Sequence, residues 1–508
     1  MLKEKIRIVI CILTLINTPL LVHGQERKAL KTDFESELRF VQNELWINPA
    51  LIDHQYKWEF TDASLTYKTR ESLGLYNIEE GNKNTSIDFD AYSYKNTTKS
   101  SLYGRATYNN STTENINWNT VSDHILLAPY VVADSIGGKS FKENYAFEGI
   151  YKRSIKESSF AIQFKYKSSE SYRKLDPRPK STVSDLNIII GGATPIFANY
   201  KFGISLNYHD YQQNHGVEAM RPGTGIKLFY LRGFGISDEN FSTVITDRQS
   251  NSNTYDIKGY SIAAQLMPDA SSGFFHSLSY NTNRVELQTT HQLDIVSHLE
   301  NKKAGLVIGK SYQSIKRDIK IKAFVSYTDK KGFEYNYNHD RKLLSSGQKY
   351  SSNLLNAGIN SVWLNHGTKN KALYNVELAY TKDESDYKTS SLQQPKQVIE
   401  YLRIKALGGK SLGFTKSGLN IKLSGTYLYT INNELVLSQF TEERVNNTLV
   451  LPNYNYLKND KLIIDSDIRY DIDSKREYGL YGRFNCQYIF IKTSKPQYSM
   501  ALSIGLTL

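Results

Sequence analysis

The sequence predicts an all-β fold, a transmembrane antiparallel β-barrel of about 18 strands, with a range of roughly 16 to 20. Two patterns predict it. Apolar and polar residues alternate along most of the chain, and the connections between these segments are alternately short and long. The 37 tyrosines are a third indication, because tyrosine places its ring in a membrane interface and its hydroxyl in water. A mean hydropathy of -0.48 is compatible with this fold, since only every second strand residue must be apolar.

The C-terminal segment shows the alternation most clearly. Its apolar residues share one parity: Tyr498, Met500, Leu502, Ile504, Leu506 and Leu508. Successive strand residues face opposite sides, so the segment offers one face to lipid and a small, mostly polar face to a lumen. Such an ending resembles the signal by which the barrel-assembly machinery recognises outer-membrane barrels, which usually end in an aromatic residue rather than a leucine. The resemblance implies that Tyr498 to Leu508 bind the barrel-assembly machinery. It also implies that the outward face of the wall contacts outer-membrane lipid.

The first residues have the pattern of a secretory signal peptide. Lys3, Lys5 and Arg7 precede the apolar run Ile8–Ile16, and cleavage is expected before Gln25. The run is too short for a transmembrane helix, which needs about 20 residues. We therefore expect export to the outer membrane of a Gram-negative bacterium. The expected regions are a signal peptide at 1–24, an N-terminal periplasmic or luminal segment at 25–60 and the barrel at 61–508.

About 18 segments alternate in this way. They are 62–72, 84–96, 100–109, 143–153, 157–168, 182–194, 198–210, 254–267, 273–285, 302–313, 317–329, 351–365, 370–382, 396–408, 416–430, 461–472, 476–491 and 497–508. The connections are then alternately short periplasmic turns and long external loops, provided that 211–253 is a single external loop. Otherwise the apolar stretch Ile226–Gly235 would be an additional, unpaired strand. No helical stripe interrupts the series.

A barrel of about 18 strands is wide enough for an aqueous lumen unless something fills it. The parity opposite the lipid face is mainly basic. Its basic members are Arg105, Lys152, Lys165, Lys201, Lys320, Lys322, Arg403, Lys405, Lys422, Arg469 and Arg483. These side chains either pair with acidic residues across strands or create a field that favours anionic solutes. The net charge of +12 does not indicate nucleic acid, because no helix or stacking motif organises it.

A rigid turn precedes the first strand. Pro49 fixes its own backbone angle and biases Asn48 away from helix. The turn either leads into the wall or holds the N-terminal segment in the lumen. The sequence Asn48-Pro49-Ala50 resembles the start of the long-chain fatty-acid transporter superfamily and of secretion-associated barrels in Bacteroidota. That resemblance implies a luminal hatch, although the superfamily has fewer strands. The strands, rich in tyrosine, asparagine, serine and lysine, resemble those of uncharacterised Bacteroidota outer-membrane barrels.

No residue pattern predicts catalysis, a cofactor or a metal site. His209-Asp210 and His339-Asp340 come nearest to an acid–base pair, and His209 with His215 comes nearest to paired metal ligands. Adjacent residues on a strand face opposite sides and cannot address one substrate. Cys486 is the only cysteine after the signal peptide, so an intrachain disulfide is excluded in the mature chain. We expect no enzyme, no cofactor and no metal.

The sequence thus favours a channel or transporter for a solute, with a porin-like lumen gated by the N-terminal segment. The alternative is a non-transporting accessory barrel that docks a surface lipoprotein or a secretion component through the loops 110–142, 211–253 and 431–460. A rim hydrolase is a third possibility, and it requires a serine or an acid–histidine pair to converge in the fold.

Overall fold

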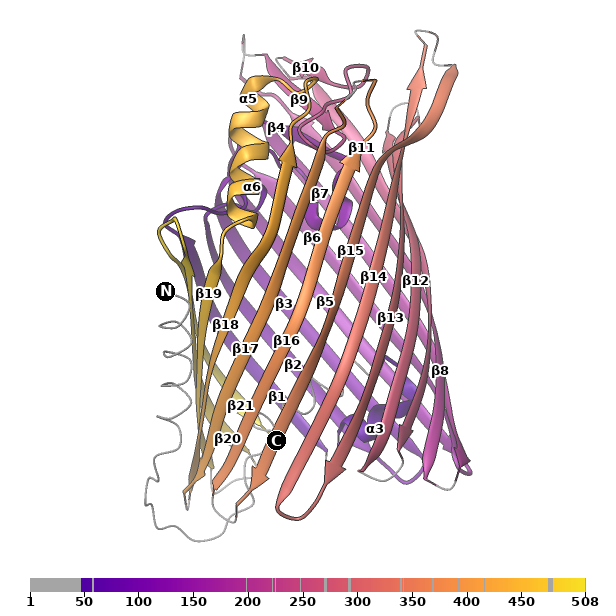
Figure 1. Cartoon of the computed structure of the whole chain (residues 1–508), viewed down its shortest axis with the longest axis vertical. Helices are drawn as coiled ribbons and strands as arrows, with labels where there is room; N and C mark the ends of the chain where they lie inside the picture. Colours follow the sequence, from indigo (N-terminus) through magenta and orange to yellow (C-terminus); the bar gives the residue numbers. More distant parts are fainter. Residues whose placement is uncertain are drawn as a thin grey trace.

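In the computed structural model, 18 strands form one closed antiparallel barrel (Figure 1). The structure describes residues 47–507, with short gaps at 57–58, 198, 222, 224, 247, 269–271, 291–293, 339, 341, 368–369, 391–392, 415 and 474–477. The predicted signal peptide, Leu508 and His339 lie outside the described residues. In order around the wall, the strands are β1 (Phe60–Ser72), β2 (Lys83–Asn96), β3 (Ser100–Ile116), β5 (Gly138–Ile155), β6 (Ser158–Arg173), β7 (Arg178–Phe197), β8 (Tyr200–Glu218), β11 (Ser250–Pro268), β12 (Gly273–Thr289), β13 (Ile295–Gln313), β14 (Arg317–Tyr337), β15 (Leu343–His366), β16 (Asn370–Tyr387), β17 (Lys396–Gly413), β18 (Ser417–Val436), β19 (Lys461–Asp473), β20 (Gly479–Ile491) and β21 (Gln497–Thr507).

The last strand closes the wall against the first. β21 pairs with β1 from Asp62↔Thr507 to Ser72↔Gln497 and with β20 on its other side. A closed wall leaves no strand edge facing lipid, where its backbone groups would lack partners. The end where β1 begins and β21 ends is called periplasmic below, and the opposite end external. The predicted fold class is confirmed, and each predicted strand segment coincides with one observed strand.

Most strands run further at their external ends than the sequence predicts. β3 continues to Ile116 instead of ending at 109, and β15 begins at Leu343 instead of 351. These extensions project beyond the belt of apolar outward side chains, so their outward faces meet water and need no alternation. The wall is also uneven. β14 and β15 have 21 and 24 residues, whereas β19, β20 and β21 have 13, 13 and 11.

The outward face of the wall is built to contact lipid. Exposed leucine, isoleucine and phenylalanine side chains cover it, among them Ile162 on β6, Ile190 on β7 and Leu206 on β8. Tyrosines follow on the external side and meet across strands, with 5.5 Å between the ring centroids of Tyr208 and Tyr260. Such a belt with an aromatic border is typical of outer-membrane barrels. Among the described residues, no helix has the length and apolarity needed to cross a membrane.

One pair of neighbouring residues on β18 tests which face meets lipid. Ile421 is 38% exposed and Lys422 is 7% exposed, which places them on opposite sides of the wall. We expect Ile421→Arg to destabilise the barrel by about 2–4 kcal/mol if the site lies at the bilayer midplane, and Lys422→Ala to be better tolerated. Heat-modifiable mobility on gels measures both variants. Equal damage at the two positions would contradict the assignment of faces.

Three external connections, residues 117–137, 219–249 and 437–460, fold together and are called the external plug. They contain a second antiparallel sheet, in which β9 (Ile226–Leu231) lies between β4 (Val131–Asp134) and β10 (Thr243–Ile245). The plug also contains α4 (His124–Leu127), α5 (Glu443–Val445), a π-helical turn η3 (Asn446–Val450) and α6 (Leu451–Leu457). Figure 1 shows this sheet, α5 and α6 at the external end of the barrel. The expectation of no helix is therefore wrong for 443–457, whereas Ile226–Gly235 does stay out of the wall.

The plug is held by an apolar core that it shares with the inner face of the wall. Leu127 and Leu228 from the plug belong to one buried cluster with Tyr211 of β8 and with Tyr255 and Ile257 of β11. The backbone N–H of Val132 in β4 donates to the hydroxyl of Tyr255 at 2.9 Å. Since the cluster joins loop residues to inward-facing wall residues, the chain itself fills part of the external lumen.

The remaining short helices lie before β1 and between β1 and β2. They are η1 (Pro49–Leu51), α3 (Ile52–Gln55) and η2 (Ile78–Glu80). In η1, Asn48 is the N-cap, because its side-chain oxygen accepts a hydrogen bond from the backbone N–H of Ala50 at 2.9 Å. Pro49 occupies the first helical position, where its missing N–H costs nothing. This explains locally why the predicted rigid turn forms.

Candidate functional site

Buried ion pairs fasten the external plug to the wall. Asp134 at the end of β4 accepts from Arg173 of β6 at 2.7 Å, and both side chains are almost fully buried. On another part of the wall, Glu334 of β14 contacts Arg232 of the plug at 3.0 Å and accepts from the Tyr387 hydroxyl of β16 at 2.8 Å. Removing one partner of a buried pair leaves an uncompensated charge and costs several kcal/mol. The plug is thus attached at two separated positions on the ring.

A buried histidine connects the plug to two further strands. Thr120 donates its hydroxyl proton to the carbonyl of Val132 at 2.5 Å, so Nε2–H of His215 on β8 must donate to Thr120, 3.1 Å away. Nδ1 of His215 then accepts from the Ser181 hydroxyl of β7 at 3.0 Å. Ser181 and His215 are 1% and 2% exposed. This serine–histidine pair is therefore closed to a substrate and serves to hold the plug.

The sequence named His209 with Asp210 and His209 with His215 as the nearest approaches to an acid–base pair and to metal ligands, and the fold brings neither pair together. His209 contacts Asp185 of the neighbouring strand at 3.0 Å, and Asp210 lies on the opposite face of β8. His215 is occupied by hydroxyl groups, so it does not join His209 in a metal site. Within the described part of the chain, no three histidine, cysteine, aspartate or glutamate side chains are close enough to hold a metal ion.

At the periplasmic end, Asn48 is inserted into a notch on the inner face of the wall. Its side-chain Nδ2 donates to the backbone carbonyls of Gly192 on β7 at 2.9 Å and Ile204 on β8 at 3.0 Å. Two inward-facing glycines make this possible, since a Cβ at Gly191 would lie 2.0 Å from Asn48 Oδ1 and one at Gly203 would lie 2.8 Å from its Nδ2. The predicted turn thus meets β7 and β8 from inside the barrel.

Further contacts continue along residues 47–56. The hydroxyl of Ser159 on β6 donates to the carbonyl of Ala50 at 2.9 Å, and Asp53 forms an ion pair with Lys152 of β5. Tyr56 stacks on Tyr103 of β3, with 5.7 Å between the ring centroids. Residues 47–56 therefore bind one side of the inner wall, from β3 to β8.

The notch gives a direct test of this binding. We expect Gly191→Ala to expel the Asn48 side chain, because the new Cβ would take the position of Oδ1, and to make the segment before β1 much more susceptible to limited proteolysis. Gly192→Ala is the matched control, since its Cβ would meet nothing nearer than 3.7 Å. Heat-modifiable mobility of both variants shows whether the barrel is intact. Equal cleavage rates in folded Gly191→Ala and Gly192→Ala would contradict a role for the notch.

A polar cavity of about 560 Å³ lies on the inner face between β17 and β1. In the ring of strands, only β2 separates it from the strands β3 to β8 that residues 47–56 contact. The strand register places Lys422, Asp467, Asn485, Ala501 and Lys68 in one row across five strands. Ala501 and Ser499 are two residues apart on the inner face of β21. Because both side chains are small, they leave space between the longer side chains of the neighbouring strands.

Basic groups outnumber acidic groups around this cavity. The charged lining residues are Lys68, Lys405, Lys422, Arg483, Asp465 and Asp467. Both carboxylates have partners: Asp467 accepts two hydrogen bonds from Arg483, at 2.9 and 2.5 Å, and Asp465 accepts from Gln487 at 2.6 Å. The cavity therefore has positive charge in excess, together with hydroxyl and amide groups.

Most of the predicted basic lining residues form ion pairs. The pairs are Arg105 with Asp90, Lys152 with Asp53, Lys165 with Glu148, Arg403 with Glu377, Arg469 with Asp471 and Arg483 with Asp467. Lys201, Lys320, Lys322 and Lys422 also have interaction partners. Three of the predicted lining residues, Lys405, Lys422 and Arg483, meet at the cavity. Lys68, which the sequence pattern did not single out, lies there too.

Comparisons with solved structures find similar chains at low identity. The ferric preacinetobactin receptor BauA from Acinetobacter baumannii is 9% identical, with 88% of this chain and 80% of that chain covered and a TM-score of 0.42. The siderophore receptor PiuA from Acinetobacter baumannii is 7% identical, with 89% and 82% covered and a TM-score of 0.41. The copper transporter OprC is 8% identical, with 89% and 81% covered and a TM-score of 0.39. Such low values transfer neither ligand nor activity.

A search of curated proteins gives no match. A protein-family model, in contrast, matches residues 49–508 and so includes the turn at Pro49, the external plug and every strand of the wall. The chain therefore belongs to the family described as a family of unknown function (DUF6850).

Proposed function

We propose that the protein moves a small polar solute with negative charge across the outer membrane, through a lumen that its own segments close at rest. The observation that carries this proposal is the polar cavity with excess positive charge on the inner wall. In a site of reduced dielectric, a few cationic groups attract an anion strongly and repel a cation. A lumen with these two inserted segments needs a gating movement, unlike a permanently open porin.

The proposal includes finer features predicted from the sequence. The N-terminal segment, held by Asn48 at the periplasmic end, acts as one gate, and the external plug acts as the other. The signal peptide 1–24 is cleaved during export, and the barrel is assembled into the outer membrane of a Gram-negative bacterium of the Bacteroidota type. The ion pairs at Lys152 and Asp134 support the two gates, because each joins an inserted segment to the wall.

Charge reversal at the cavity tests the solute class. We expect Lys68→Glu with Lys405→Glu to change the ion preference of the conducting state from anions to cations at low salt, where the charges are least screened. Reversal potentials across a planar bilayer with unequal salt on the two sides measure this preference. The control is Lys139→Glu on the outward face of β5, where the lysine is exposed. An unchanged reversal potential in the double variant would rule out the cavity as the selective element.

The second candidate function is a non-transporting accessory barrel that docks another protein. One observation favours it: residues 335–349 of β14 and β15 project beyond their neighbours, since pairing with β13 ends at Glu334 and pairing with β16 begins at Tyr350. Leu343 and Leu344 are exposed on this hairpin, the latter at 67%. The loops 110–142, 211–253 and 431–460, predicted for docking, contribute residues to the external plug and remain part of the proposed docking surface. A docking barrel needs no conducting state, so conductance separates the two functions.

A further inference from the structure

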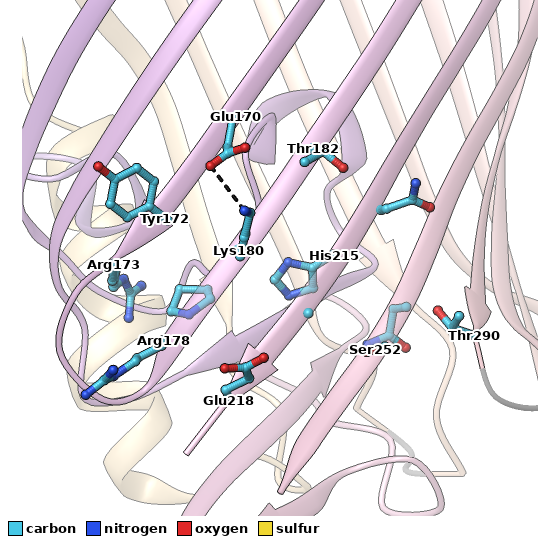
Figure 2. A pocket seen from close by; sticks show the side chains of 14 residues that line it. Glu170, Tyr172, Arg173, Arg178, Lys180, Thr182, His215, Glu218, Ser252 and Thr290 are labelled. Atoms are coloured by element: carbon cyan, nitrogen blue, oxygen red, sulfur yellow. Dashed lines mark ion pairs between the residues drawn. The ribbon is translucent and has the colours of Figure 1, made fainter. Parts of the chain in front are cut away.

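A second polar groove, of about 650 Å³, lies on the outward side of the wall near its external end (Figure 2). Its side chains come mainly from β6, β7, β8 and β11. Register places Tyr172, Lys180, Gly216 and Ser252 in one row across these strands. Even-numbered residues face outward here, as do the lipid-facing Ile162, Ile190 and Leu206 on β6, β7 and β8. The groove is therefore continuous with the lipid-facing surface and separate from the lumen.

The groove lies further toward the external end of the strands than the lipid-facing belt. On β8, Tyr208 belongs to the external tyrosines that border the lipid belt, and Asn214 in the groove follows six residues later. Six strand residues span about 20 Å along the strand, and somewhat less along the membrane normal because strands tilt. This level lies beyond acyl chains and the interfacial tyrosines. A molecule anchored in the outer leaflet reaches it only with a long polar headgroup.

The lining offers donors and acceptors side by side. Lys180 and Glu170 form an ion pair at 3.3 Å, visible in Figure 2, and both are exposed. Arg178 is opposite Glu218 on the neighbouring strand. The groups without charge are the hydroxyls of Thr182, Ser252 and Thr290, the amide of Asn214 and the ring of Tyr172. A sugar hydroxyl both donates and accepts, so it needs such paired groups. The third basic lining residue, Arg173, is already paired with the buried Asp134. The other opposite charges balance, which disfavours a dense anion.

Gly216 forms the floor of the groove. A Cβ at this position would meet only ordinary contacts, with the nearest atom, Ser252 Oγ, at 3.7 Å. The glycine is thus not needed for packing or for an unusual backbone angle. Its effect is the space it leaves between Lys180 and Ser252. At one end of the groove, Tyr172 stacks on Phe141, with 5.4 Å between the ring centroids. Lys174 lies over the Phe141 ring, so the Tyr172 ring is the aromatic surface offered to a sugar ring.

We propose that this groove binds the oligosaccharide headgroup of a glycolipid in the outer leaflet. Such a ligand would bind the outer side of β6, β7, β8 and β11. On the inner side of the same strands, Arg173 and His215 hold the external plug. The site is distinct from the proposed solute cavity, and it stands whether or not the protein transports.

Filling the groove tests the proposal. Purified protein in detergent is incubated with lipopolysaccharide, and the lipopolysaccharide that co-elutes with it on size exclusion is measured per protein. We expect Gly216→Leu to reduce retention about tenfold, equivalent to about 1.4 kcal/mol. Gly347→Leu is the matched control, because a Cβ there has no atom within 4 Å and it lies outside the groove, on β15. Heat-modifiable mobility establishes that both variants are folded.

Two competing ligands show whether the sugar or the anionic lipid part of lipopolysaccharide is bound. Delipidated oligosaccharide from the same lipopolysaccharide should compete for the groove, whereas phosphatidylglycerol micelles should not. A folded Gly216→Leu that retains lipopolysaccharide as the wild type does would overturn the proposal. So would competition by phosphatidylglycerol equal to that of the oligosaccharide, because retention would then depend on anionic lipid alone.

Discussion

Replacing residues 220–248 with a short turn should give a protein with a large, stable conductance. The deletion removes β9, the central strand of the plug sheet, together with β10 and Arg232. The lumen of a barrel with this strand number is wide enough to conduct when it is not filled. The cut can be joined without strain, because the backbone N–H of Ala219 donates to the carbonyl of Gln249 at 3.1 Å, and a two-residue Asn-Gly turn suits such a pair.

Single-channel recording in planar bilayers measures this effect, with the wild type expected to conduct several-fold less. The control replaces residues 338–342 by the same turn between the cross-strand partners Tyr337 and Leu343. This shortens the projecting hairpin and keeps Tyr337, whose ring contacts Phe241 of the plug. Combining the plug deletion with Gly191→Ala should raise conductance further if residues 47–56 are a second gate. If the plug deletion and the combined variant both stay silent, transport through the lumen is contradicted and the docking function becomes the better explanation.

Deleting Ser499 to Leu508 should abolish the folded barrel altogether. Loss of β21 would expose the edges of β20 and β1, which now pair with it along their length. Unpaired backbone groups cost several kcal/mol each in hydrocarbon, so an open wall cannot persist in the bilayer.

Fractionation and heat-modifiable mobility check this outcome, with no folded protein expected in the outer membrane. The shortened hairpin, which leaves the closure of the wall intact, is expected to assemble normally. Folded, membrane-inserted protein without β21 would mean that closure by this strand is not required.

The sequence predicted the wall well, because alternation reports which face of a strand meets lipid. Ile421 and Lys422 are an example. Ile421 faces hydrocarbon and must be apolar, whereas Lys422 faces the lumen and can be charged. The external ends of strands such as β15 were missed, since both of their faces contact water or protein. The Asn48 turn was recognised from its proline, but its notch depends on Gly191 and Gly203, which are far away in the chain and carry no signal of their own.

The external plug could not be predicted for a related reason. Asp134 and Arg173, or Arg232 and Glu334, are ordinary charged residues until the loops fold back between the strands. The helix at 443–457 has only a short apolar stripe, in which Val445, Leu449 and Val450 are buried, and this is too brief to stand out from loop sequence. The cavity at Lys68 and Lys422 likewise arises from register between strands at opposite ends of the chain.

The unequal strand lengths give the external mouth of the barrel a slope. The tall side, at β14 and β15, rises well past the rim formed by β19, β20 and β21, and Figure 1 shows α5 and α6 above this low side. There the boundary of the mouth is made of loop and helix, joined to η2 where the side chain of Asn453 accepts from the backbone N–H of Ile78 at 3.0 Å. A molecule moving in the plane of the outer leaflet would therefore meet loop and helix on this flank. On the tall side it meets only wall.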